Sequence, residues 1–186
     1  MPHVRSPDRL DINRSALWVI DLQEKLVPVI PSASEIESTV CRLLEAANRL
    51  SVPTGATVQY PKGLGPLVPS LREHLSDPEE KVDFSAAVCR RDLDAWAKSG
   101  RDQIVIVGIE THICVLQTVL DLIAEGHRPY VVSDAVGSRG QQDHDDAIAR
   151  MRDSGATIVT SESILFEWLS TAKHPEFKVI SQLVKN

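Results

Sequence analysis

Cys114 is the residue whose surroundings point most directly to chemistry. Upstream of it, residues 104–107 are four consecutive β-branched side chains without polar alternation, which predicts a parallel strand buried on both faces. Apolar residues then recur at helical spacing until Gly126, a typical C-terminal stop. Cys114 is therefore expected in the first turn of a helix, where unpaired N–H groups and the helix dipole lower a thiol pKa below its free value of about 8.5. The alternative is a small, inert core cysteine.

Composition limits the classes of protein to which the chain can belong. Its 186 residues, 42% of them hydrophobic, suit a single domain over residues 1–186. The net charge of −6 argues against nucleic acid as a partner. No apolar segment approaches the roughly 20 residues of a membrane span, and residues 1–5 lack the apolar core of a signal peptide, so we expect a cytoplasmic protein that does not enter a membrane.

The cysteine count and spacing give no sign of a disulfide framework. There are three cysteines, an odd number, and none forms a C-x-x-C pair. Zinc binding through such a pair is likewise not indicated. We expect Cys41, Cys89 and Cys114 to be reduced thiols, with Cys41 beside a helical apolar stripe.

Strands and helices alternate along the whole chain, which predicts a doubly wound parallel sheet with helices on both faces. The segment 61–69, rich in Gly and Pro, is expected to be an irregular loop. Strands are predicted at 16–20, 52–60, from 103 onward, at 130–133 and at 156–160. Helices are predicted at 35–50, 93–98, from Cys114 to Gly126, and at 141–154, 163–170 and 175–184.

Asp21 directly follows the first predicted strand. In doubly wound sheets the reactive site lies beyond the carboxyl ends of the strands, where the strand order reverses. If the first strand and the strand before Cys114 are neighbours there, the Asp21 carboxylate and the thiol face each other. Alone, Asp21 would be interpreted as an ordinary loop or helix-capping aspartate.

Three separated motifs resemble the isochorismatase-like cysteine hydrolase family, over about residues 16–164. They are Asp21-Leu22-Gln23, Lys81-Val82-Asp83-Phe84-Ser85, and Gly108-Ile109-Glu110-Thr111-His112-Ile113-Cys114. The segment Val132 to Arg139 also looks like the family's segment after the next strand. The resemblance implies a doubly wound α/β fold, a homo-oligomer, a cis peptide bond between Ile109 and Glu110, and a triad of Asp21, Lys81 and Cys114.

The implied chemistry gives each triad residue a role. Asp21 would accept the thiol proton, Lys81 would form an ion pair with Asp21, and Cys114 would attack the carbonyl carbon of a small molecule. The resemblance implies that the backbone N–H groups of Glu110 and Cys114 hold the oxyanion. The expected outcome is cleavage of an amide-type C–N bond through a thioester, without a cofactor or a metal.

Departures from the family's better-known members narrow the substrate. A cysteine at position 114 argues against isochorismate, because the ether-cleaving members lack it. The family's nicotinamidases carry an Asp-x-His metal motif after the second strand, whereas residues 57–65 contain no histidine. The loop after Tyr60 instead resembles a compact branch, the isochorismatase domain-containing proteins. Candidate substrate-contacting residues are Gln23, Leu26, Tyr60, Phe84, Ile109 and Ile113.

Two other features could suggest a catalytic histidine and a metal site, but each has a simpler explanation. His112 lies two residues from Cys114, and residues two apart on a helix do not face each other, so we expect it to be a turn or wall residue. The acidic tract 143–146 fits the polar start of an amphipathic helix better than a metal site.

Two other functions remain open: an oligomeric binding protein with a vestigial triad, and a thiol redox protein in which Cys89 approaches Cys114.

Overall fold

A single six-stranded parallel sheet forms the centre of the protein. The computed structural model describes residues 4–185, so residues 1–3 of the segment considered as a signal peptide lie outside the described residues. The strand order is β3-β2-β1-β4-β5-β6, and every neighbouring pair is parallel. The predicted doubly wound α/β fold is therefore confirmed. The strands are β1 (Ser15–Ile20), β2 (Thr54–Gln59), β3 (Glu79–Lys81), β4 (Gln103–Ile109), β5 (Arg128–Gly137) and β6 (Thr157–Val159).

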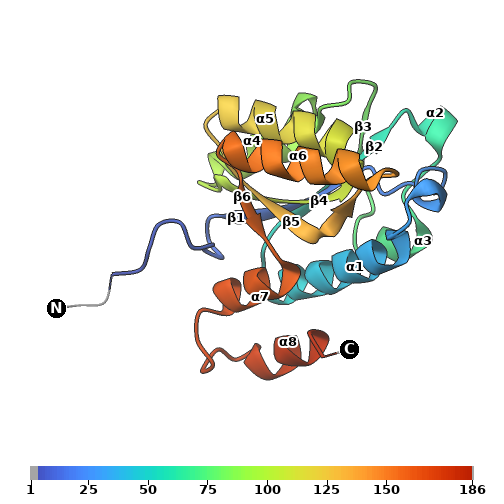
Figure 1. Ribbon diagram of the computed structural model, residues 1–186. Coiled ribbons are helices and arrows are strands. Elements are labelled where there is room, and N and C mark those ends of the chain that lie inside the picture. Colours follow the sequence, from blue (N-terminus) through green and yellow to red (C-terminus); the bar gives the residue numbers. More distant parts are fainter. Residues whose placement is uncertain (1–3, 186) are drawn as a thin grey trace.

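Helices cover both faces of this sheet, as Figure 1 shows. One face carries α4 (Arg90–Lys98), α5 (Leu116–Ala124) and α6 (Gln141–Asp153). The other carries α1 (Ala33–Arg49), α7 (Ser161–Leu169) and α8 (Phe177–Leu183), with the short α3 (Pro69–Arg72) beside α1. Within residues 4–185, no helix is both long and apolar enough to cross a bilayer.

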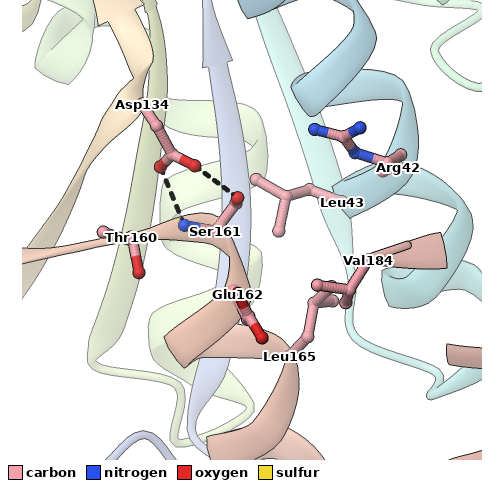
Figure 2. Close-up of a pocket in the computed structure, with 8 residues that line it drawn as sticks. All are labelled: Arg42, Leu43, Asp134, Thr160, Ser161, Glu162, Leu165 and Val184. Atoms are coloured by element: carbon pink, nitrogen blue, oxygen red, sulfur yellow. Dashed lines mark hydrogen bonds between the residues drawn. The ribbon is translucent and has the colours of Figure 1, made fainter. Parts of the chain in front are cut away.

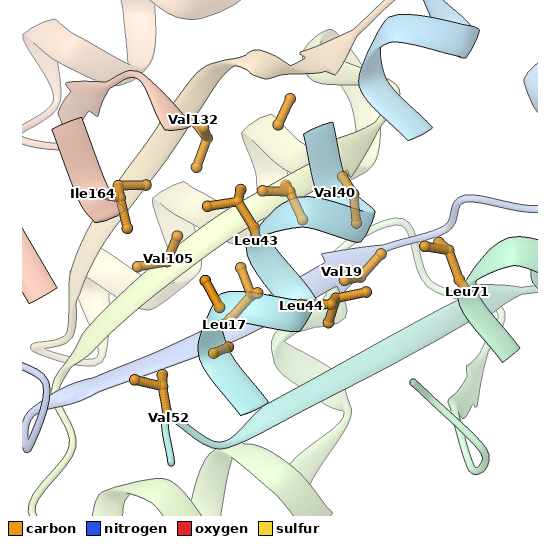
Figure 3. Close-up of a cluster of buried hydrophobic side chains, with 14 of the residues drawn as sticks. Leu17, Val19, Val40, Leu43, Leu44, Val52, Leu71, Val105, Val132 and Ile164 are labelled. Carbon is orange, nitrogen blue, oxygen red and sulfur yellow. The ribbon is translucent and has the colours of Figure 1, made fainter. Parts of the chain in front are cut away.

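Successive side chains of the central strands point to opposite faces of the sheet, and they belong to two separate hydrophobic cores. Leu17, Val19 and Val105 pack under α1 and α7, with Leu43, Leu44 and Ile164 among their neighbours (Figure 3). Trp18, Ile20 and Ile106 point to the opposite face, where they meet α4 and α5. Because β1 and β4 are buried on both faces, their sequences show no polar alternation.

Three local features differ from the expectation from sequence. β3 was not predicted, because it is a three-residue edge strand with two glutamates. The segment 61–69 is not wholly irregular: Pro61–Leu64 forms one helical turn, α2, which begins at a proline and ends at Gly65 with a φ of 80°. Cys114 lies not in the first turn of an α-helix but in a π-helical turn, Thr111–Val115, that precedes α5.

Gly108 permits the closest approach between the two central strands. It pairs with Ile20 at the end of β1, and its φ is 119°. A Cβ atom at position 108 would lie 2.0 Å from the Ile20 carbonyl oxygen, which no real side chain tolerates. This glycine therefore sets the spacing of the strand ends that carry Asp21 and the turn of Cys114.

Replacing Gly108 with alanine should destabilise the fold strongly. The strained φ and the overlap with rigid backbone together should cost roughly 3 kcal/mol or more in the free energy of unfolding. Gly100→Ala is the matched control, because Gly100 also has a positive φ, 77°, but a Cβ atom added there would meet nothing within 4 Å. Urea unfolding of both variants measures the difference, and equal losses would contradict the close approach of the two strands.

Candidate active site

A buried ion pair lies at the carboxyl ends of β1 and β3. Lys81 Nζ donates to Asp21 Oδ2 at 2.6 Å, and both side chains are fully inaccessible to solvent. Thr57 Oγ1 donates to the other carboxylate oxygen, Oδ1, at 2.8 Å. Asp21 has a φ of 51°, a left-handed conformation that aspartate adopts more readily than most residues. Two hydrogen bonds, one of them from the Lys81 cation, thus fix the carboxylate from the sheet side.

The ammonium group of Lys81 is fully coordinated by protein oxygens. Besides Asp21, it donates to Gln59 Oε1 at 2.7 Å and to the carbonyl oxygens of Phe84 at 3.0 Å and Asp83 at 3.3 Å. Gln59 in turn donates through Nε2 to the Val82 carbonyl oxygen at 2.7 Å. A buried charge is tolerated only with such partners, so the site holds Lys81 in one orientation.

Gln23 is a structural residue and not a substrate contact, which corrects the expectation from sequence. Its side chain is fully buried, and both ends of its amide are bonded to backbone. Oε1 accepts from Gln59 N at 2.7 Å, and Nε2 donates to the carbonyl oxygens of Gln59 and Gly65 at 2.9 and 2.6 Å. Its role is to join the chain after Asp21 to the end of β2.

Cys114 faces this ion pair as a neutral thiol. Its side chain is 6% exposed. Burial first, and the Asp21 carboxylate second, raise the pKa of the Cys114 thiol to about 12, against an opposing effect of Lys81. The expectation that a helix N-terminus lowers this pKa is therefore wrong. The physical reason is that desolvation and a nearby carboxylate both oppose the thiolate.

The backbone beside Cys114 makes a sharp, fixed turn. The peptide bond between Ile109 and Glu110 is cis, where the family resemblance implies it. Ile109 pairs with Gly137 at the end of the β4–β5 ladder. The carbonyl oxygen of Glu110 accepts from the N–H groups of Ile113 and Val115. The position of Glu110 is thus fixed by the ladder before it and by the turn after it.

The remaining candidate substrate contacts divide into exposed and buried residues. Tyr60 and Phe84 are 54% and 53% exposed, and Tyr60 lines a cavity of about 370 Å³ with Lys81 and Val82. Leu26 and Ile113 are half-buried against the two cores. Ile109 is 1% exposed and belongs to the core under α1, so the expectation that it contacts substrate is wrong.

Another cavity, of about 330 Å³, lies away from this chemistry. Figure 2 shows it between Arg42 of α1, Leu165 of α7 and Val184, with Asp134 accepting hydrogen bonds from Ser161 N and Oγ. Leu165 belongs to the core under α1, whereas Cys114 belongs to the core on the other face of the sheet. This cavity therefore contributes nothing to the site of the thiol.

The histidine and the acidic tract have structural partners. His112 Nδ1 lies 2.9 Å from Ser138 Oγ, and His144 Nδ1 lies 3.0 Å from Thr111 Oγ1. Within the part of the chain that the structure describes, no group of three or more His, Cys, Asp or Glu residues could hold a metal. His112 is thus a turn residue with no contact to the ion pair.

Sequence reasoning missed three residues that position the others. Thr57 and Gln59 lie two residues apart on β2, so their side chains share one face of the strand. The sequence alone gives no sign that they are more than ordinary strand residues. Thr118 is fully buried in α5; its Oγ1 donates to the Cys114 carbonyl oxygen at 2.6 Å and accepts from Ala86 N at 2.8 Å. Only the polar residues of β2, beside the apolar β1, could have signalled the first two.

Comparison with known proteins gives a consistent result. The isochorismatase domain model matches residues 15–163. A mouse (Mus musculus) protein named isochorismatase domain-containing protein 2A is 42% identical over 92% of this chain and 82% of its own length. A Xenopus laevis protein named isochorismatase domain-containing protein 2 is 39% identical over 99% of this chain and 90% of its own length.

Solved structures share the fold closely. A structure titled as a MAR1 ribonuclease from Caenorhabditis elegans has a TM-score of 0.89 and 40% identity, and the match covers 96% of this chain and 93% of that one. The YcaC gene product of Escherichia coli, titled an octameric hydrolase of unknown specificity, has a TM-score of 0.82 and 25% identity, with 98% of both chains covered.

Asp21 and Lys81 should be strongly coupled in a double-mutant cycle. Asp21→Asn or Lys81→Met alone leaves one buried charge unpaired, which should cost about 3–5 kcal/mol in the free energy of unfolding. The double variant removes both charges, so its loss should fall well below the sum of the single losses. Denaturant unfolding of the four proteins measures this coupling. Additive losses, within about 0.5 kcal/mol, would contradict the buried ion pair.

Proposed function

The chain belongs to the isochorismatase family, and on this premise we propose that it is a cysteine hydrolase that cleaves an amide-type C–N bond of a small molecule. The observation that carries the proposal is the buried Asp21–Lys81 ion pair at 2.6 Å with the Cys114 thiol beside it. A charged pair with no access to solvent is costly to maintain, and a reactive thiol next to it gives the carboxylate a proton to accept.

The first chemical step is attack of the Cys114 sulfur on the substrate carbonyl carbon. Because the pKa of the thiol is raised to about 12, the proton must leave as the S–C bond forms, and Asp21 is the base placed to take it. Lys81 holds the Asp21 carboxylate in place through its hydrogen bond to Oδ2. The Glu110 N–H and the Cys114 N–H bind the developing oxyanion.

The second half of the reaction returns the enzyme to its starting state. Protonated Asp21 gives its proton to the leaving nitrogen, the C–N bond breaks, and an acyl thioester remains on Cys114. Asp21, again a carboxylate, then accepts a proton from water as the water attacks the thioester, and it returns that proton to the sulfur as the S–C bond breaks. The thiol and the carboxylate are both regenerated, and the products are a carboxylic or carbamic acid and an amine or ammonia.

The sequence and its relatives constrain the substrate class. Residues 57–65 lack the Asp-x-His motif expected of a metal-dependent nicotinamidase, so a nicotinamide substrate is disfavoured. One structural neighbour is titled a ribonuclease, but a net charge of −6 opposes binding of a polyanion to this chain. A small neutral amide or carbamoyl compound fits better.

The two rival functions fit the site less well. A redox-sensing thiol needs a low pKa and exposure, whereas the Cys114 thiol is 6% exposed and its pKa is raised. Cys89 lies in the same core cluster, where burial and then Glu79 raise its pKa to about 11. A binding protein with a vestigial triad would have no need of the charged pair, since apolar residues could replace it without loss of stability.

Assembly of several copies forms part of the proposal. The E. coli neighbour is titled an octamer, and several large apolar side chains on this chain are half or more exposed. Tyr60, Val82 and Phe84 are 54%, 74% and 53% exposed, near the end of β3. We therefore expect a homo-oligomer.

Replacement of Cys114 should separate hydrolysis from folding. Cys114→Ala should abolish ammonia release from a panel of small amides and carbamoyl compounds, because the nucleophile is lost, while removal of one buried sulfur leaves the fold intact. Cys89→Ala, a second buried cysteine in the same core, is the control that should keep turnover. Ammonia release that survives in Cys114→Ala would rule out the proposed thioester route.

A further inference from the structure

The three residues at the start of the nucleophile turn are all tied to one segment. Glu110, Thr111 and His112 contact residues 138–144, here called the β5–α6 segment. Glu110 Oε2 accepts from both N and Nε of Arg139, each at 3.0 Å. The other two contacts are the pairs of Thr111 with His144 and of His112 with Ser138. The turn is thus attached at three consecutive positions.

Of these three contacts, only the one between Glu110 and Arg139 joins two charged side chains, and its geometry is the most tightly fixed. One carboxylate oxygen receives two N–H donors from a single residue, which fixes both the distance and the direction of the side chain. The Glu110 side chain is 8% exposed, although that of Arg139 is 59% exposed. The charge of the carboxylate therefore lies inside the protein, where a fixed hydrogen-bond geometry is hardest to rearrange.

The same residue carries one of the two N–H groups that the proposed mechanism assigns to the oxyanion. A side chain held at its far end limits rotation of the peptide to which it is attached. We propose that Glu110, held by Arg139, is a positioning residue that aims its own N–H at the carbonyl oxygen of the substrate. This inference rests on the proposed hydrolase function and extends it to a residue outside the triad.

Two reagents that react with the same thiol can separate positioning from reactivity. Iodoacetamide alkylates sulfur with loss of iodide and forms no oxyanion at the reacting carbon. p-Nitrophenyl acetate acylates sulfur through an oxyanion: the S–C bond forms, p-nitrophenolate leaves, and the thiol proton passes to Asp21. Only the second reaction needs a donor aimed at the carbonyl oxygen.

The experiment measures both modifications of Cys114 by mass spectrometry in the full-length protein. Glu110→Ala should lower the acylation rate roughly tenfold to a hundredfold, as expected when an oxyanion donor is misaligned, and should leave alkylation within about twofold. Arg139→Ala should lower acylation less, because the Arg139 backbone N–H still donates to Glu110. Glu125→Ala is the matched control, since its carboxylate pairs with Arg90 on the surface, and it should change neither rate.

The outcomes distinguish this inference from the function on which it rests. Equal losses of acylation and alkylation in Glu110→Ala, or no loss of either, would overturn the positioning role while wild-type acylation still supports the hydrolase. A wild-type Cys114 that is alkylated but never acylated would contradict the proposed function, and the inference with it.

Discussion

The buried ion pair between Asp21 and Lys81 is the constraint on which the rest of the site depends. Two opposite charges with no solvent access must be satisfied by the protein, and they are: Thr57 bonds the carboxylate, while Gln59 and two carbonyl oxygens bond the ammonium. Removing any one of these groups leaves a charged or polar atom desolvated, which costs more than the bond itself contributes. The pair therefore requires a rigid end to β1, β2 and β3.

The two halves of the doubly wound sheet supply different parts of the site. β1, β2 and β3 provide the charged pair and its partners, and the chain after β4 provides the thiol and the cis turn at Glu110. Gly108 lets β4 approach β1 closely enough for the halves to meet. Thr118 then connects the halves by bonding the Cys114 carbonyl oxygen and Ala86 N, in the segment that follows Lys81. The point where strand order reverses is thus also where the Asp21–Lys81 pair and the Cys114 thiol converge.

Sequence reasoning placed the residues at strand ends well and their environments poorly. Asp21 and the turn of Cys114 were found because hydrophobic periodicity shows where buried strands end, and Lys81 was found through the family resemblance alone. The pKa of Cys114 was predicted in the wrong direction, because the helix-dipole argument takes no account of burial, the larger cause, or of a carboxylate supplied by another strand. Gln23 was assigned to substrate contact because nothing in a sequence reveals that all its amide groups bond to backbone.

The central claim is that Asp21 holds Cys114 as a thiol and later removes its proton. The pH dependence of Cys114 alkylation by iodoacetamide, resolved by mass spectrometry in wild type and Asp21→Asn, tests it most directly. Wild-type alkylation should be slow at neutral pH, with a midpoint near the thiol pKa of about 12. Asp21→Asn removes a charge that opposes the thiolate, so its alkylation midpoint should shift to lower pH. A wild-type midpoint below the free-thiol value of about 8.5, or an unshifted midpoint in Asp21→Asn, would contradict the claim.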